Sequence, residues 1–179
     1  MVAPMRVEFP QIAKCEKCET FFWLTNHIDE IDENDKTKYP DAILSRFLTT
    51  DEYQEAIELK TYTTTVEQSF LRMKLWYTYN DRIRDMKPDN TDTIFTNTLF
   101  TNPTDSSIYE DNCLSLINIL DKNEENKRIS IAELHRNLGQ YVNAIALLDT
   151  VQDPKFQFAV TFIKKKCEES FKFTCLINV

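Results

Sequence analysis

Apolar residues recur at helical spacing between residues 128 and 163, and this stretch has the clearest pattern in the chain. Ile131, His135 and Leu138 lie about one helical turn apart, which predicts a helix with one inward stripe. Gly139 follows this stripe and is the only glycine in the 179 residues. Because glycine adopts the positive φ of a helix end without steric cost, the pattern predicts that the helix stops there.

Two more helical stripes follow the glycine. The second consists of Ala144, Ile145, Leu148 and Val151, and the third consists of Phe156, Val160 and Ile163. Pro154 separates them, because proline cannot continue a helix and disfavours helical geometry in the residue before it. A short glycine turn between two amphipathic helices predicts an antiparallel pair whose apolar faces meet.

Residues 128–154 resemble one unit of the tetratricopeptide repeat family, whose units contain about 34 residues. The matching residues are Ile131, Ala132, Gly139, Tyr141, Ala144 and Leu148. Arg128 and His135 depart from the pattern because they stand where the family has aromatic residues, and Pro154 arrives about two residues early. One unit cannot bury its own apolar face, so the resemblance implies that other helices, or a second molecule, complete a stack.

Further elements are predicted outside this stretch. Helices are expected over residues 51–59, 66–86 and 108–121, with Asp51 capping the first. The patterns Thr64-x-x-Glu67 and Ser107-x-x-Glu110 have the form of capping boxes and predict where the other two begin.

The chain ends are expected to meet in a small sheet. Residues 171–179 alternate strictly between two faces, which is the period of a strand, and the other strand candidates lie in residues 5–24. The predicted fold is therefore mainly α, with tetratricopeptide-like antiparallel helix pairs and a small β element formed by the N-terminal segment and the C-terminal strand.

Four segments are predicted along the chain. They are an N-terminal Cys-x-x-Cys element (1–27), an acidic loop with an aromatic helix (28–87), a loop (88–107) and a helical block with the C-terminal strand (108–179). The order of these features also resembles a group of uncharacterised bacterial proteins, a resemblance that carries no activity.

The predicted helix over residues 66–86 is the most aromatic of the chain. Trp76, Asn80 and Arg82 lie on it, and a polar segment after an aromatic stripe could line a groove for a partner. These residues are the candidate partner-binding set, and the alternative is that they are core and ordinary surface residues of a helix end.

Cys15 and Cys18 have the spacing with which a tight turn presents two thiolates to one tetrahedral zinc ion. Glu19 follows where a zinc knuckle usually has glycine or another turn residue, and a second Cys-x-x-Cys is absent from the sequence. The fold would have to supply the remaining ligands, and the predicted sheet favours Cys175. The other candidates are His27, Cys113 and Cys167. The alternative is a structural thiol pair without metal.

Composition and charge narrow the class of protein. Hydrophobic residues make up 42% of the chain, which indicates a folded globule, and the net charge of −8 argues against a nucleic-acid partner. The apolar runs are too short to span a membrane, and five scattered cysteines fit the reducing cytoplasm.

Catalytic motifs are missing from the sequence. With one glycine there is no glycine-rich phosphate loop, and the two histidines stand far apart along the chain. We therefore expect a non-enzymatic helical module that binds proteins or serves as a scaffold, with self-association as one way to complete the stack. The alternative is a small regulatory module that binds zinc through Cys15 and Cys18. An enzyme whose active site is assembled from residues distant in the sequence ranks third.

Overall fold

The computed structural model describes residues 10–24, 46–84, 100 and 103–172, and its described part is mainly helical with one small antiparallel sheet. The chain divides into two compact units, Met1–Thr61 and Tyr62–Val179. This boundary falls inside the segment 28–87, so the first predicted helix belongs to the N-terminal unit.

The first unit contains a β-hairpin and one helix. Strands β1 (Ile12–Lys14) and β2 (Phe21–Trp23) pair antiparallel, with Ala13 opposite Phe22. Among the described residues, the sheet therefore consists of these two N-terminal strands. Of the predicted C-terminal strand, Phe171 and Lys172 are not in a strand, and residues 173–179 lie outside the described residues.

Helix α1 (Thr50–Glu58) is capped by Thr49, which precedes the predicted cap, Asp51, in the sequence. The Thr49 hydroxyl accepts a hydrogen bond from the Glu52 amide at 3.3 Å, and the Glu52 carboxylate accepts one from the Thr49 amide at 2.8 Å. This reciprocal box satisfies two amides that the helix start would leave unpaired, which explains why the cap is Thr49.

Polar contacts join the hairpin to α1 and to the residues directly after it. Lys14 on β1 forms an ion pair with Glu55 at 2.6 Å. The indole N–H of Trp23 on β2 donates to the carbonyl of Thr61 at 2.8 Å. Both strands therefore make polar contacts with the segment that contains α1.

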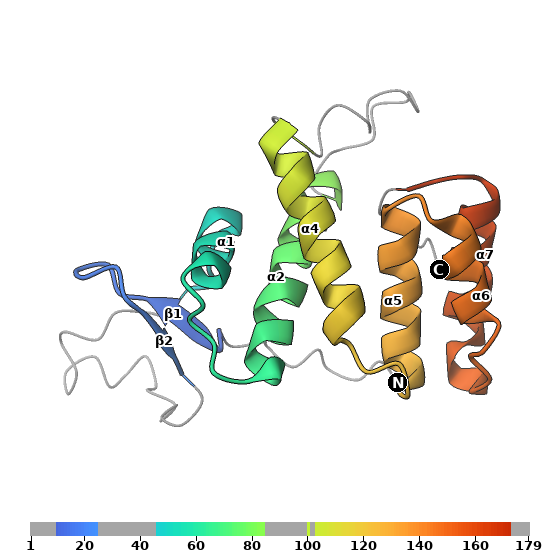
Figure 1. The fold of residues 1–179 in the computed structure, drawn as a ribbon, viewed down its shortest axis with the longest axis horizontal. Coiled ribbons are helices and arrows are strands. Elements are labelled where there is room, and N and C mark those ends of the chain that lie inside the picture. Colours follow the sequence, from blue (N-terminus) through green and yellow to red (C-terminus); the bar gives the residue numbers. More distant parts are fainter. Residues whose placement is uncertain (1–9, 25–45, 85–99, 101–102, 173–179) are drawn as a thin grey trace, which may run out of the picture. The chain divides into compact units, whose positions relative to one another are not determined.

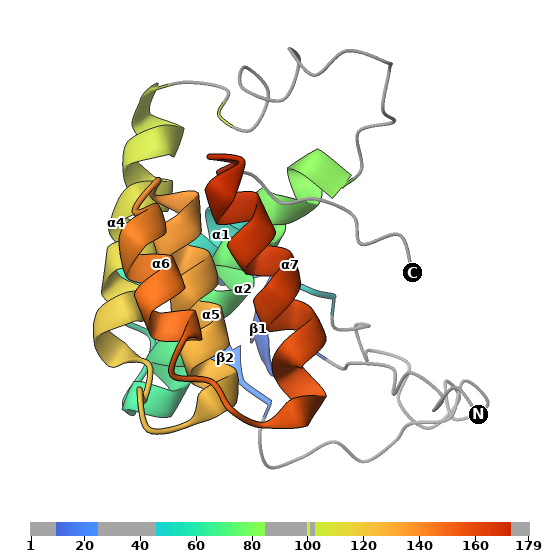
Figure 2. The same cartoon turned by 90° about the vertical axis from the view of Figure 1, so that its right-hand side faces the viewer.

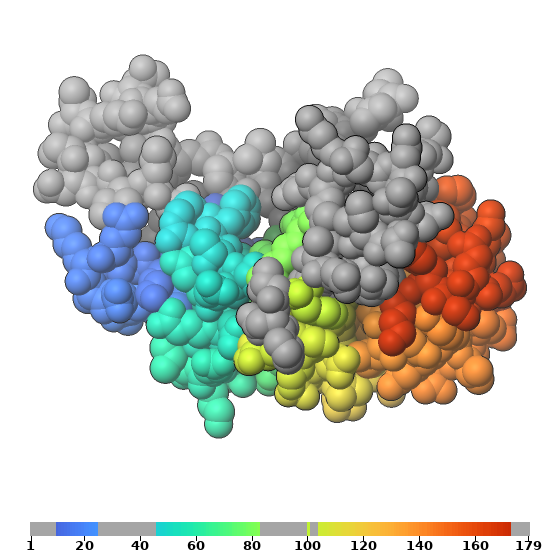
Figure 3. Space-filling view, turned by 90° about the horizontal axis from the view of Figure 1, so that it is seen from above, coloured from blue at the N-terminus to red at the C-terminus, as the bar shows by residue number. Residues whose placement is uncertain are grey.

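The second unit is built from consecutive helices. They are α2 (Thr65–Arg84), α4 (Pro103–Ile119), α5 (Glu125–Asn137), α6 (Tyr141–Leu148), a 3-10 turn (Pro154–Phe156) and α7 (Gln157–Glu168). Each helix packs on its neighbour along the chain, and α5 also contacts α7. Figure 1 and Figure 2 show α5, α6 and α7 side by side, and Figure 3 shows α4 to α7 as one continuous body from yellow to red.

The helix starts of this unit test two predicted capping boxes. The box of Thr64 and Glu67 is present, since each amide donates to the partner side chain, at 3.1 and 3.0 Å. The prediction that Ser107 and Glu110 form a capping box is wrong, because α4 already begins at Pro103 and Ser107 lies inside the helix. Proline has the φ of a helix and lacks an amide that the first turn would leave unpaired, so it favours this earlier start.

The predicted turn at Gly139 is confirmed. The α5 helix ends just before it, Gly139 has φ +73°, and α6 begins at Tyr141. The amides of Gly139 and Gln140 donate to the carbonyls of Arg136 and His135, which is the Schellman pattern of a helix end.

An apolar core joins the last three helices. Its buried members are Ala132, Ala144, Leu148, Val151, Val160, Ile163 and Cys167. The second and third predicted stripes thus face inward as expected. The buried face of α5 differs from the stripe that the sequence predicts, because Leu134, Arg136 and Asn137 are buried while His135 is half-buried. None of the described helices is both long and apolar enough to cross a membrane.

Candidate functional site

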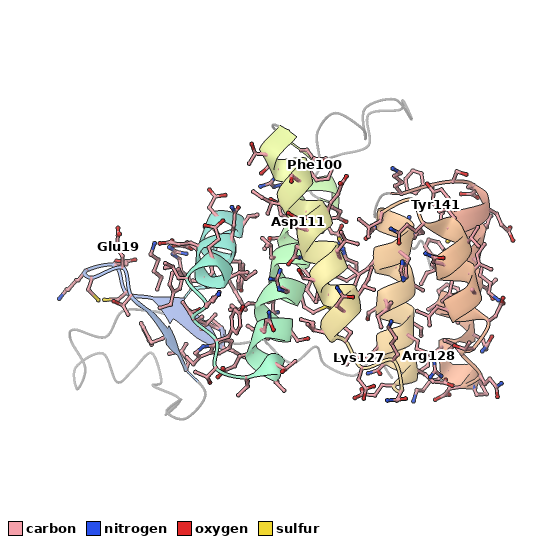
Figure 4. All side chains as sticks on the ribbon, in the orientation of Figure 1. Glu19, Phe100, Asp111, Lys127, Arg128 and Tyr141 are labelled. Carbon is pink, nitrogen blue, oxygen red and sulfur yellow. The ribbon has the colours of Figure 1, made fainter. Side chains whose placement is uncertain are left out.

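Cys15 and Cys18 lie in the turn between β1 and β2, at the outer end of the hairpin. The amide of Cys15 donates to the carbonyl of Thr20 at 2.9 Å, and the amide of Glu19 donates to the carbonyl of Cys15 at 2.8 Å. These bonds close a tight turn that contains both thiols. Figure 4 shows Glu19 in the loop that joins the two strands, with its side chain pointing away from the sheet.

Glu19 has φ +57°, in the left-handed region that favours glycine. A zinc knuckle usually has glycine at this position, and here a residue with a side chain adopts the same kind of backbone. The conformation costs roughly 1–2 kcal/mol for a residue with a Cβ.

The two thiols differ in exposure. Cys18 is exposed and Cys15 is half-buried. Hydrogen bonds from the side chain and backbone of Thr20, and then from the Cys15 thiol, lower the pKa of Cys18. Both features favour the thiolate, which is the form that binds metal. Within the described ranges, no group of three or more metal-binding side chains comes together.

The other candidate ligands belong to the second unit or lie outside the described residues. Cys113 and Cys167 belong to the interior of the Tyr62–Val179 unit. Burial raises the pKa of the Cys113 thiol to about 12 and raises that of Cys167 as well, which opposes the thiolate. His27 and Cys175 lie outside the described residues.

The predicted partner-binding residues lie mainly in the interior. Trp76 is 6% exposed and Asn80 is 3% exposed, so both are core residues of the helical unit. Arg82 is half-buried and pairs with Asp105 of α4 at 3.0 Å. These side chains join α2 to the helices around it, which is why they do not line an open groove.

A polar cluster that the sequence patterns did not predict lies where α5 turns into α6. Its members, Arg136, Asn137 and Tyr141, all donate hydrogen bonds to main-chain carbonyls of residues 170–172, directly after α7. Arg136 donates to the carbonyl of Phe171 at 2.5 Å, and Asn137 donates to that of Lys172 at 2.6 Å. Tyr141 donates to the carbonyl of Ser170 at 2.6 Å. We call these three residues the α5 clamp.

Further hydrogen bonds fix the side chains of Arg136 and Asn137. Arg136 is 1% exposed, and its guanidinium also binds both carboxylate oxygens of Glu133, one turn earlier. The side-chain oxygen of Asn137 accepts a hydrogen bond from the Trp76 indole at 3.0 Å. The orientation of both donors is therefore fixed by buried partners.

The clamped segment itself has an unusual turn at its start. Ser170 has φ +54°, and the amides of Ser170 and Phe171 donate to the carbonyls of Cys167 and Lys166. This Schellman turn directs the chain from α7 toward the clamp. The Lys172 side chain then lies against Gly139, where an added Cβ would come within 2.7 Å of it.

A shallow hollow of about 300 Å³ lies between α5 and α6. It is lined by Lys122, Ile131, His135, Asn143, Ala146 and Leu147. His135 Nδ1 is 2.6 Å from the Gln140 side-chain oxygen, so this ring nitrogen already has a partner. The histidine thus has a structural role at the helix turn.

The described residues therefore contain two candidate sites, the thiol turn in the first unit and the α5 clamp in the second. In comparisons of the chain with family models, curated proteins and solved structures, none of the three found a match.

Proposed function

We propose that this chain is a non-enzymatic helical module that binds a protein or peptide partner. The observation that carries the proposal is the packing of α5, which contacts α4 before it and both α6 and α7 after it. Helices that pack mainly on their sequence neighbours are typical of repeat proteins, which use the exposed sides of the stack for binding.

The spacing of the helices supports a tetratricopeptide-like stack as the finer description. The helices α5 and α6 form a pair around Gly139, and α7 begins roughly one repeat length after the start of α5. In this description, α7 takes the place of the first helix of a following unit. The helices α2 and α4 supply the neighbours that a single unit needs to bury its face.

A peptide selection with the full-length chain tests the proposal. We expect a random-peptide library to yield sequences that share a pattern and bind the chain with micromolar affinity, while scrambled versions do not bind. Repeated selections that recover only peptides with equal affinity for an unrelated acidic protein would refute it.

A second candidate function is zinc binding at Cys15 and Cys18. The carrying observation is the knuckle-like turn, in which both thiols share one loop and Glu19 adopts the backbone of the usual glycine. Zinc would use the two thiolates and draw further ligands from elsewhere. In this role the turn holds the sulfurs and Thr20 favours the thiolate of Cys18.

Elemental analysis of the purified full-length chain tests this candidate. We expect close to one equivalent of zinc, lost in the Cys15→Ser, Cys18→Ser double variant and retained in Cys113→Ser. Less than a tenth of an equivalent in the unmodified protein, purified without chelator, would reject it.

A further inference from the structure

Cys15 and Cys18 lie close enough in their turn to form a disulfide with each other. The amide of Glu19 donates to the carbonyl of Cys15 at 2.8 Å, which closes a single helical turn around both cysteines. In such a turn, Cα atoms three residues apart are about 5 Å apart, within the roughly 4.4–6.8 Å that disulfides span. The Cys15 thiol also donates a hydrogen bond to the Cys18 sulfur. The two sulfur atoms are therefore already neighbours in the reduced chain.

The hairpin fixes both ends of this turn. Lys14 pairs with Phe21 at the end of the strand ladder, and the amide of Cys15 donates to the carbonyl of Thr20 at 2.9 Å. These contacts belong to the same short segment as the thiols. The spacing of Cys15 and Cys18 is therefore set locally, by the strands on either side of the turn.

Solvent reaches the thiol pair from the side of Cys18. Cys18 is exposed and Cys15 is half-buried, and Lys17 between them is exposed. Cys113 and Cys167, in contrast, are buried. Because thiol–disulfide exchange requires access to the attacking sulfur, exposure assigns the first attack to Cys18 and leaves Cys15 as the neighbour that completes the exchange.

We propose that Cys15 and Cys18 are a redox-active pair, which small-molecule disulfides oxidise reversibly to an intramolecular disulfide. The pair needs neither a peptide partner nor zinc, so this inference goes beyond the proposed function. A metal binds the thiolate form, and the oxidised pair has no thiolate left. Oxidation and zinc binding therefore exclude each other at this turn.

The exchange takes place in two steps. The Cys18 sulfur loses its proton and attacks one sulfur of the small disulfide, whose S–S bond breaks; one small thiol leaves with a proton, and Cys18 carries the other half as a mixed disulfide. The Cys15 sulfur then loses its proton and attacks the Cys18 sulfur, so that the Cys15–Cys18 bond forms and the second small thiol leaves with a proton. In total the pair loses two electrons and two protons, and the small disulfide gains them.

The short span of the turn favours a disulfide that is easily reduced again. Residues three apart on a helical turn have Cβ atoms about 5–6 Å apart. A disulfide brings its two Cβ atoms to about 3.8 Å, so the bond has to draw the turn tighter. Strained or exposed disulfides are the labile ones, and we therefore expect a small thiol in excess to reverse the oxidation.

Peptide mapping of the full-length chain tests the proposal. The chain is freed of metal with a chelator, equilibrated with mixtures of oxidised and reduced glutathione, and treated with a thiol-blocking reagent. Trypsin then cleaves after Lys17, which stands between the two cysteines, so a Cys15–Cys18 disulfide joins two separate peptides. We expect the joined peptides to become the main form as the share of oxidised glutathione rises, and to disappear in excess reduced glutathione.

Single serine variants test the order of the two steps. Because Cys18 attacks first, Cys15→Ser should stop at a mixed disulfide between Cys18 and glutathione. Cys18→Ser should acquire glutathione at Cys15 at least several-fold more slowly, since Cys15 is half-buried. Glu16→Ser, at an exposed position of the same turn, is the matched control and should form the joined peptides as the unmodified chain does.

Three results would overturn the proposal. They are complete blocking of both thiols at every glutathione ratio, a mixed disulfide on Cys18 that persists in the unmodified chain, and joined peptides that come from two chains linked as a dimer on non-reducing electrophoresis. The measurement uses neither a peptide ligand nor zinc, so its outcome is separate from those of the peptide selection and the elemental analysis.

Discussion

The hydrogen bond between Trp76 and Asn137 gives the sharpest prediction for stability, because it joins α2 to the clamp through two buried residues. The indole N–H donates to the Asn137 oxygen at 3.0 Å, and the amide nitrogen of Asn137 donates to the Lys172 carbonyl at 2.6 Å. Asn137→Ala removes both bonds and takes away the Asn137 acceptor of the indole N–H, where Trp76 is 6% exposed. Lys172 is exposed, so its carbonyl can bind water instead.

The expected loss of stability follows from the surroundings of the two lost hydrogen bonds, one buried and one exposed. An unpaired buried donor costs about 1–3 kcal/mol, and the lost bond at the exposed carbonyl adds about 1 kcal/mol. We therefore expect Asn137→Ala to lower the free energy of unfolding by about 2–4 kcal/mol. That is a large part of the roughly 5–15 kcal/mol that stabilises a typical domain.

A double-mutant cycle with Trp76→Phe, followed by circular dichroism in denaturant, isolates the shared bond. We expect a coupling energy of about 1–2 kcal/mol between the two sites, since Trp76→Phe removes the donor that Asn137→Ala would strand. Asn143→Ala, at an exposed asparagine of α6, is the control and should change stability by less than about 0.5 kcal/mol. A coupling energy below about 0.5 kcal/mol would contradict the assigned bond.

The remaining predictions concern backbone conformation and pH. Lys60 and Glu19 have φ +52° and +57°, so Lys60→Gly and Glu19→Gly should each raise stability by about 0.5–1 kcal/mol in thermal or denaturant unfolding. Gly139→Ala should lower it by about 1–2 kcal/mol, because alanine is strained at φ +73°. Hydrogen bonding to Arg46 lowers the pKa of Glu52 from 4.5 to about 2. The ionised Glu52 carboxylate therefore stabilises the fold fully at pH values above the pKa that Glu52 has in the unfolded chain. This stabilisation is lost as the pH falls toward the lower pKa that Glu52 has in the folded chain. Glu52→Gln should reduce this acid-induced loss of stability by about 1–2 kcal/mol, a modest amount because the Arg46 side chain is 55% exposed and solvent screens the ion pair. An unchanged dependence of stability on pH would exclude the Arg46–Glu52 pair as its cause.

The sequence by itself determined the helical elements and the turn at Gly139. Local signals suffice for these features, because a helix end at positive φ, a proline break and a capping box each depend on residues within one or two turns. The prediction failed where two local signals competed. Ser107-x-x-Glu110 resembled a helix start, but Pro103 was already compatible with the first helical position.

The tertiary structure alone decided which polar residues became buried and what they bind. Arg136 and Asn137 are adjacent polar residues on a helix, and nothing in their local sequence indicates that a chain segment about 35 positions later supplies their acceptors. Likewise, Trp76 looks like a surface aromatic until α5 places Asn137 beside it. Such contacts depend on how helices pack, and packing is a property of the whole unit, whereas periodicity and turns are properties of neighbouring residues.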